Sequence, residues 1–106
     1  MANYDEKYSF FQGGSGNWYV MNPLKPSMEF SFKGYLFSLE ILGIKEQKYR
    51  ELIKNYGGDF FTKDSMIFYF NERLNASKFC SFMNKEYKKY KIKKYYEKKE
   101  RLNERK

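Results

Sequence analysis

The sequence predicts an α+β fold in which a small antiparallel sheet packs against two helices. Three observations predict it. Some segments alternate apolar and polar residues with the period of a strand, others repeat apolar residues with helical spacing, and glycines or short polar turns separate them. A chain of 106 residues suits one domain that buries its own core. We expect about four to five strands in the order β-ββ-α-ββ-α, with a long, basic C-terminal helix.

Residues 1–16 show no clear period, and we expect them to form a loosely organised N-terminal arm. Its aromatic side chains would anchor it to the core, and these are Tyr8, Phe10 and Phe11. Residues 13–16 read Gly-Gly-Ser-Gly, which predicts a flexible loop. A phosphate-binding loop is the alternative, but the Gly-Lys-Ser/Thr that completes a P-loop does not follow. Residues 18–21 favour a strand that stops at Asn22 and Pro23.

Residues 28–42 alternate with period two, which predicts extended structure. The apolar positions are Met28, Phe30 and Phe32 before Gly34, and Tyr35, Phe37, Leu39 and Ile41 after it. The phase therefore flips at Gly34, and such a flip indicates a turn or a bulge. We favour a hairpin with Lys33 and Gly34 at its tip. One long, bulged strand is the alternative.

The middle of the chain switches to helical spacing and then back to strands. Residues 45–56 place apolar side chains at i, i+3, i+4 and i+7, and these are Tyr49, Leu52, Ile53 and Tyr56. Gly57 and Gly58 then predict the end of this helix. Residues 59–62 and 65–70 favour two strands, with Lys63 and Asp64 as the turn between them.

The last helix is predicted to begin after Asn71, as its N-cap, with Glu72 in its first turn. Its core stripe consists of Ala76, Phe79, Cys80, Met83, Tyr87 and Tyr90, in which Cys80 is expected to be buried and inert. A second apolar facet consists of Ile92, Tyr95, Tyr96 and Leu102. Because Ile92 is rotated roughly 200° from Tyr90 on a straight helix, the two sets cannot pack on one core. Either the helix bends near Lys91, or its end projects and offers the second facet to a partner.

The net charge of +8 is concentrated at one end of the chain. Residues 85–106 hold 11 basic and 4 acidic residues, whereas residues 1–84 hold 10 basic and 9 acidic ones. We therefore divide the chain into a nearly neutral α+β body, residues 1–84, and a basic helical extension of the same domain, residues 85–106. Such a block is typical of segments that bind nucleic acid or another acidic surface. The alternative is a solvated helix that has no binding role and only keeps the protein soluble.

Within the basic extension, lysines alternate with tyrosines. Lysines neutralise phosphates and release counterions, and tyrosine rings stack on unpaired bases. The candidate nucleic-acid-binding residues are Lys88, Lys89, Lys91, Lys93, Lys94, Lys98, Lys99 and Arg101. The candidate stacking or partner-facing residues are Ile92, Tyr95 and Tyr96. The mixture suits single-stranded or structured RNA or DNA better than sequence reading of a duplex, which usually relies on Arg and Asn.

Catalysis has little support in the sequence. Histidine is absent, which excludes Ser-His and Cys-His nucleophile pairs and histidine-ligated metals. Carboxylates at Asp59, Asp64 and Glu72, with Lys63 nearby, suggest a metal-dependent nuclease as a third choice. Asp and Glu are common in turns and at helix caps for structural reasons alone, so their presence here is weak support for catalysis. We therefore expect a non-catalytic binding protein without a cofactor or a metal.

A protein partner is the main alternative to nucleic acid. The Lys-, Asn- and aromatic-rich composition is typical of AT-rich genomes, and small chains of this kind often come from phages or mobile elements. The chain would then be an inhibitor that binds a host defence protein or a nucleic-acid-containing complex, for example an anti-CRISPR that blocks a Cas effector. The polar, acidic start and the lack of a long apolar run favour a cytoplasmic protein that does not engage a membrane. The high aromatic content also allows a homodimer.

Overall fold

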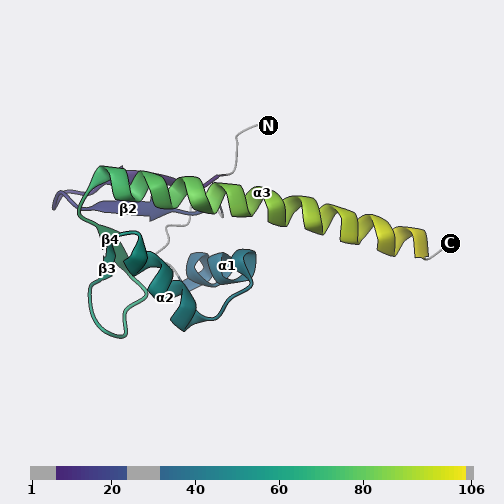
Figure 1. The fold of residues 1–106 in the computed structure, drawn as a ribbon, viewed down its shortest axis with the longest axis horizontal. Helices are drawn as coiled ribbons and strands as arrows, with labels where there is room; N and C mark the ends of the chain where they lie inside the picture. The colour runs from purple at the N-terminus through teal and green to yellow at the C-terminus, as the bar shows by residue number, and fades with distance from the viewer. Residues whose placement is uncertain (1–6, 24–31, 105–106) are drawn as a thin grey trace.

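The structure, a computed structural model, describes residues 7–23 and 32–104, with the backbone alone for residues 100–104. It is an α+β fold, as predicted, with one four-stranded antiparallel sheet and three helices within the described residues (Figure 1). The elements in chain order are β1 Ser9–Gln12, β2 Trp18–Met21, α1 Phe32–Leu42, α2 Glu46–Asn55, β3 Gly58–Phe60, β4 Phe68–Phe70 and α3 Arg73–Glu104. The strands follow one another across the sheet as β1-β2-β4-β3.

Two hairpins make up the sheet. In the first, β1 pairs with β2 so that Phe10 lies opposite Val20, and in the second β3 pairs with β4 so that Phe60 lies opposite Phe68. The pairing of Trp18 with Phe70 joins the two hairpins through β2 and β4. The strand over residues 18–21 and the hairpin centred on residues 63–64 are therefore confirmed. The strands of that hairpin are shorter than predicted, and residues 61–67 connect them.

Strand β1 lies where we predicted a loosely organised arm. It forms because its partner, β2, returns directly after residues 13–16, where the N–H of Gly13 donates to the carbonyl of Asn17 at 2.9 Å. The side chain of Asn84 in α3 then holds the start of the strand, because its Nδ2 donates to the carbonyl of Tyr8 at 2.9 Å and its Oδ1 accepts the N–H of Tyr8. The Gly-Gly-Ser-Gly segment is thus a hairpin turn, and no helix starts from it.

The predicted hairpin at Lys33 and Gly34 is wrong, because Phe32–Leu42 form helix α1. Residues 28–31 of the predicted hairpin lie outside the described residues. The buried positions of α1 follow helical spacing, and they are Gly34, Tyr35, Ser38 and Ile41. The pattern was hidden because a polar residue, Ser38, occupies one core position, where its hydroxyl shares a 2.7 Å hydrogen bond with the hydroxyl of Tyr8. Apolar residues also occupy positions outside the buried face, so period two fitted equally well.

The helix predicted over residues 45–56 is confirmed as α2, and the last helix is confirmed as α3. Helix α3 begins at Arg73, so the position just before it belongs to Glu72 and not to Asn71, the residue that we predicted as N-cap. The carbonyl of Glu72 accepts the N–H of Ala76 at 3.3 Å, which is the first bond of the helical ladder.

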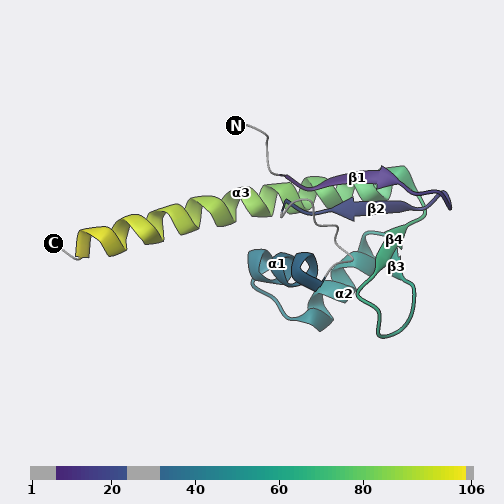
Figure 2. The same ribbon diagram turned by 180° about the vertical axis from the view of Figure 1, so that it is seen from behind.

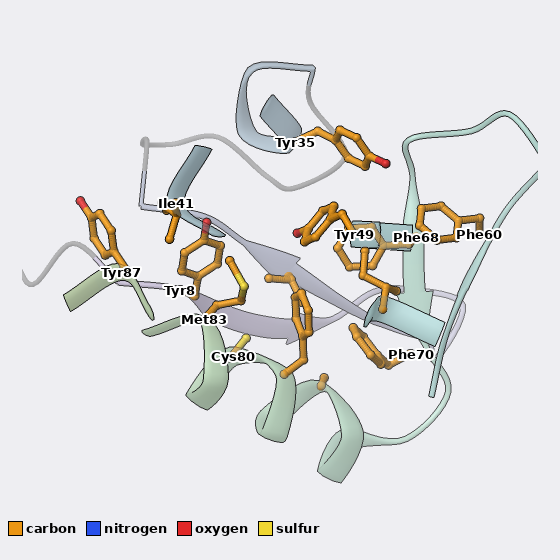
Figure 3. Packing of buried hydrophobic residues seen from close by; sticks show 14 residues of the cluster. Tyr8, Tyr35, Ile41, Tyr49, Phe60, Phe68, Phe70, Cys80, Met83 and Tyr87 are labelled. Atoms are coloured by element: carbon orange, nitrogen blue, oxygen red, sulfur yellow. The ribbon is translucent and has the colours of Figure 1, made fainter. Parts of the chain in front are cut away.

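The core lies between the sheet and the three helices and is largely aromatic (Figure 3). Phe79 of α3 is fully buried and its ring lies 5.5 Å from that of Phe70 and 6.0 Å from that of Phe68, both on β4. Tyr49 of α2 contacts the same two elements, with centroid distances of 6.4 Å to Phe68 and 6.4 Å to Phe79. Helices α2 and α3 therefore pack on the same face of the sheet, which we call the inner face.

The opposite face of the sheet, the outer face, carries a row of aromatic side chains. Its members alternate with the buried residues of the strands, and they are Phe11, Tyr19, Phe61 and Tyr69. Successive ring centroids in the order Phe11, Tyr19, Phe61 and Tyr69 lie 5.8, 6.3 and 4.9 Å apart. We call these four side chains the aromatic row.

Gly58 stands where α2 meets the sheet, at a point with no room for a side chain. A Cβ at this position would lie 2.6 Å from Cγ2 of Ile53 and 3.0 Å from the ring of Phe70. Both neighbours belong to the fully buried core, so neither can move aside cheaply. The pair Gly57 and Gly58 therefore does more than end a helix, because the absence of a side chain at Gly58 lets Ile53 and Phe70 pack closely against the backbone.

We predict that Gly58→Ala lowers the free energy of unfolding by about 1–3 kcal/mol, the usual cost of overpacking a core. The matched control is Gly14→Ala, because a Cβ at Gly14 meets nothing within 4 Å. The control should change stability by less than about 0.5 kcal/mol. Urea unfolding followed by far-ultraviolet circular dichroism measures both. Equal stability of the two variants would contradict the close approach at Gly58.

Candidate functional site

Helix α3 belongs to the core over its first half and leaves the body over its second half (Figures 1 and 2). The last residues that pack on the body are Tyr87, which is buried, and Tyr90, which is half-buried. The ring of Phe37 in α1 lies 5.7 Å from that of Tyr87 and 6.1 Å from that of Tyr90, in edge-to-face contact. Helix α1 therefore supports the point from which α3 projects.

A hydrogen bond fixes the same point. The hydroxyl of Tyr90 donates to the carboxylate of Glu40 on α1. This bond, together with partial burial, raises the pKa of Tyr90 to about 12. Because the pKa is higher in the folded than in the unfolded chain, the bond stabilises the fold fully below pH ~10 and is lost as the pH rises toward ~12. At neutral pH the attachment of α1 to α3 is intact.

Beyond Tyr90 the helix continues to Glu104 and exposes the second apolar facet. Ile92 is 49% exposed, Tyr95 61% and Tyr96 57%. At 100° per residue, the centre of this facet lies roughly 170° around the helix from the core stripe, so it faces away from the body. Of the two alternatives for this part of the chain, the projecting helix is the one that the structure contains. Leu102 lies in α3, outside the described side chains.

The candidate lysines differ in whether their ammonium groups contact other side chains. Lys89 pairs with Glu86 at 3.4 Å and Lys94 with Glu97 at 3.8 Å. The ammonium of Lys91 lies 4.5 Å from the ring centroid of Tyr87. The other four are exposed and form no ion pair among the side chains that the structure describes, and these are Lys88, Lys93, Lys98 and Lys99. Arg101 lies in α3, but its side chain is outside the described ones.

The arrangement of these charges frames the exposed facet. By helical rotation, Lys88 and Lys99 share the side of Ile92, Tyr95 and Tyr96. Lys89 and Lys93 lie on one flank of the facet and Lys91 and Lys98 on the other, whereas Lys94 continues the line of the core stripe. The rings of Tyr95 and Tyr96 contact each other with centroids 5.4 Å apart. The structure thus brings together an uncompensated cationic surface and exposed aromatic rings on one projecting element. Such a surface can hold a chain of phosphates while the rings receive flat, apolar groups.

The other motifs in the sequence form no comparable site. Among the residues that the structure describes, no group of three or more His, Cys, Asp or Glu side chains could hold a metal ion. Asp59, Asp64 and Glu72 are therefore not brought together, and Asp59 accepts the N–H of Phe60 at 2.9 Å. Cys80 is buried, as predicted. None of the described helices has the length and apolar character needed to cross a membrane.

Two surface features escaped the sequence analysis. One is the aromatic row on the outer face of the sheet, which depends on the register of three strands. The other is a groove of about 390 Å³ between α3 and the connection from α1 to α2. Its apolar lining consists of Leu42, Ile44, Leu52 and Phe82, and its charged lining residues are Lys48, Glu51 and Glu86. In the sequence Leu42 falls in a predicted strand and Leu52 in a predicted helix, whereas Ile44 and Phe82 belong to no predicted apolar face, so no signal placed the four together.

Comparison with family models, with curated proteins and with solved structures finds no match for this chain.

We predict that the exposed facet contributes nothing to folding. Replacing Ile92, Tyr95 and Tyr96 together by Ser should change the free energy of unfolding by less than about 0.5 kcal/mol, as for surface substitutions. The control is Tyr87→Ala, which opens the core at the start of the projection and should cost about 3 kcal/mol. Urea denaturation measures both variants. A large loss in the triple variant would show that the facet packs on the body.

Proposed function

We propose that this chain is a non-catalytic nucleic-acid-binding protein that uses the projecting half of α3. The observation that supports it is the combination described above: four exposed lysines with neither an ion pair nor a ring contact among the described side chains, near exposed Tyr95 and Tyr96. A charged helix that served solubility alone would gain nothing from two tyrosines turned to solvent. An anionic, aromatic polymer satisfies both features together, because its phosphates meet the lysines and its bases meet the rings.

The preferred ligand in this proposal is single-stranded or irregular nucleic acid. Tyrosine rings stack on bases only where the bases are unpaired or splayed out. The lysines contact phosphates and carry little sequence information, so the proposal predicts weak sequence preference. RNA and DNA both offer these groups. Binding of either would take place in the cytoplasm, where a buried thiol such as that of Cys80 stays reduced.

A second candidate function is the binding of a protein, as in an inhibitor of a host nucleoprotein. The observation that favours it is the groove of about 390 Å³ beside α3, whose lining combines four apolar side chains with charges of both signs. Such a groove suits an apolar side chain of a protein partner. The two functions differ in their response to salt, because counterion release governs phosphate binding and leaves an apolar contact largely unaffected.

The experiment that tests nucleic-acid binding replaces Lys88, Lys93, Lys98 and Lys99 by Gln in the full chain. Fluorescence anisotropy of a labelled single strand of about 20 nucleotides, over a series of salt concentrations, reports the affinity. Each lysine that contacts a single-strand phosphate contributes about 0.7 to the slope of log K against log salt, so the slope should become shallower by about 3.

The matched control replaces four exposed lysines of the body, Lys7, Lys33, Lys45 and Lys78, by Gln. Both variants lower the net charge from +8 to +4, so they differ in the position of the charge alone. The control should keep most of the salt dependence and the affinity. If both variants lose affinity equally, net charge and not α3 drives the binding. If the unaltered chain does not bind RNA or DNA at low salt, nucleic-acid binding is overturned.

A further inference from the structure

The aromatic row runs across three of the four strands on the outer face of the sheet. In Figure 2 strands β1 and β2 lie in front of α3, so this face is turned toward the reader there. The rings of Tyr19 and Phe61 are nearly parallel, with an interplanar angle of 9°. Phe61 is 50% exposed, and the other three rings are half-buried against their neighbours. In the row Phe61 lies between Tyr19 and Tyr69, and the half of it that remains in solvent is an area onto which a further ring can stack.

A cationic pocket lies directly beside Phe61. Its volume is about 510 Å³, and its lining includes Arg50, Lys54, Asp59, Phe61, Thr62 and Lys63. Three of these side chains are basic and one is acidic, and the acidic one, Asp59, already accepts the N–H of Phe60 at 2.9 Å. The pocket is therefore a site of local positive charge on the otherwise nearly neutral body, and it touches the row at its most exposed ring.

Arg50 is held in place and remains available as a charge. Its Nη1 donates to the carbonyl of Ser65 at 2.5 Å and its Nη2 donates to the carbonyl of Lys63 at 2.7 Å. Its guanidinium also lies over the ring of Phe60, 3.8 Å from the centroid. These partners fix the side chain without neutralising it, because none of them is a carboxylate, and Arg50 forms no ion pair among the described residues. A fixed cation loses little side-chain freedom when it meets an anion.

We propose that the aromatic row and the Arg50 pocket together bind a segment of single-stranded nucleic acid. One unpaired base stacks on the exposed ring of Phe61, and its phosphate lies in the pocket near Arg50, Lys54 and Lys63. Neighbouring bases follow the row toward Tyr69. This inference rests on the proposed function and adds a second contact surface to it, on the sheet and separate from α3. It involves no base-specific hydrogen bond, so it is tolerant of sequence.

The chemistry of the site favours this ligand over an acidic peptide. A carboxylate-rich peptide satisfies the three basic side chains but offers nothing to the half-exposed ring of Phe61. A purely apolar peptide covers the ring but leaves the cations of the pocket without partners. A nucleotide unit carries one planar ring system and one phosphate in close succession, which matches one exposed ring beside one cationic pocket. Because the site has a row of rings and not a single ring, it can stack several successive bases, which a nucleic-acid strand offers and a free nucleotide does not.

The test uses the full chain and two variants that avoid the structural role of Arg50. Phe61→Leu removes the ring but keeps an apolar side chain, and Lys54→Gln combined with Lys63→Gln removes two charges at exposed positions. Each variant should weaken binding of a single strand by about ten-fold, the size of one lost stacking or phosphate contact. Phe61→Leu should leave binding of a fully paired duplex unchanged. The controls are Phe32→Leu, at a ring that is 61% exposed on α1, and Lys33→Gln combined with Lys45→Gln.

Photo-crosslinking with an oligonucleotide that carries 5-iodouracil adds a direct readout. The expected result is a crosslink to an aromatic residue within residues 58–70, identified by mass spectrometry. Crosslinks confined to α3, together with full affinity of both sheet variants, overturn this inference and leave the proposed function of α3 standing. The converse, sheet variants that lose affinity while the α3 lysine variant keeps it, supports the sheet site and overturns the role of α3. Binding of uridine monophosphate as tight as that of the strand overturns the strand as ligand.

Discussion

The packing of Phe79 holds this fold together, because its ring joins α3 to both α2 and β4. Its ring meets Tyr49 and Tyr56 of the α2 region and Phe68 and Phe70 of β4, at centroid distances between 5.5 and 6.4 Å. A sheet whose β3–β4 hairpin has three-residue strands offers few backbone hydrogen bonds, so side-chain packing has to supply its stability. Large aromatic side chains do this with few residues, which explains how a chain with almost no alanine builds a core.

The dependence of the fold on side-chain packing between distant segments explains which elements could be predicted from the sequence. Helix α2 could, because charged residues fill its exposed side and leave a single apolar stripe. Helix α1 could not, because its exposed positions include Phe32 and Leu36 while Ser38 lies in the core. The burial of Ser38 depends on the hydroxyl of Tyr8, a residue 30 positions away. Strand β1 likewise exists through pairing with β2 and through Asn84, which lies 76 positions from Tyr8. Such long-range partners leave no local pattern.

The candidate surfaces follow the same division. The lysines and tyrosines of α3 lie on one helix, so their spacing and rotation could be calculated from the sequence before any fold was known. The aromatic row and the Arg50 pocket combine residues of all four strands, of α2 and of the connection between β3 and β4. Phe61 and Tyr69 were visible as strand residues, but their place beside Tyr19 depends on the pairing of Trp18 with Phe70. Arg50 is one of several charged residues of α2 in the sequence, and its contact with the carbonyls of Lys63 and Ser65 depends on how the β3–β4 hairpin folds back.

The position of the lysines on α3 helps to decide whether they bind a ligand or only stabilise and solvate the helix. Cations at the C-terminal end of a helix are favourable because they face the negative end of the macrodipole, but this effect fades within the last turn. Lys88, Lys93 and Lys94 lie two or more turns before Glu104, so the dipole does not account for them. Their mutual repulsion is instead a cost to the free helix. A bound polyanion would remove that cost, and the exposed tyrosines would add contacts that a solvated helix has no use for. The lysines alone fit either reading, and it is their combination with Tyr95 and Tyr96 that favours a ligand.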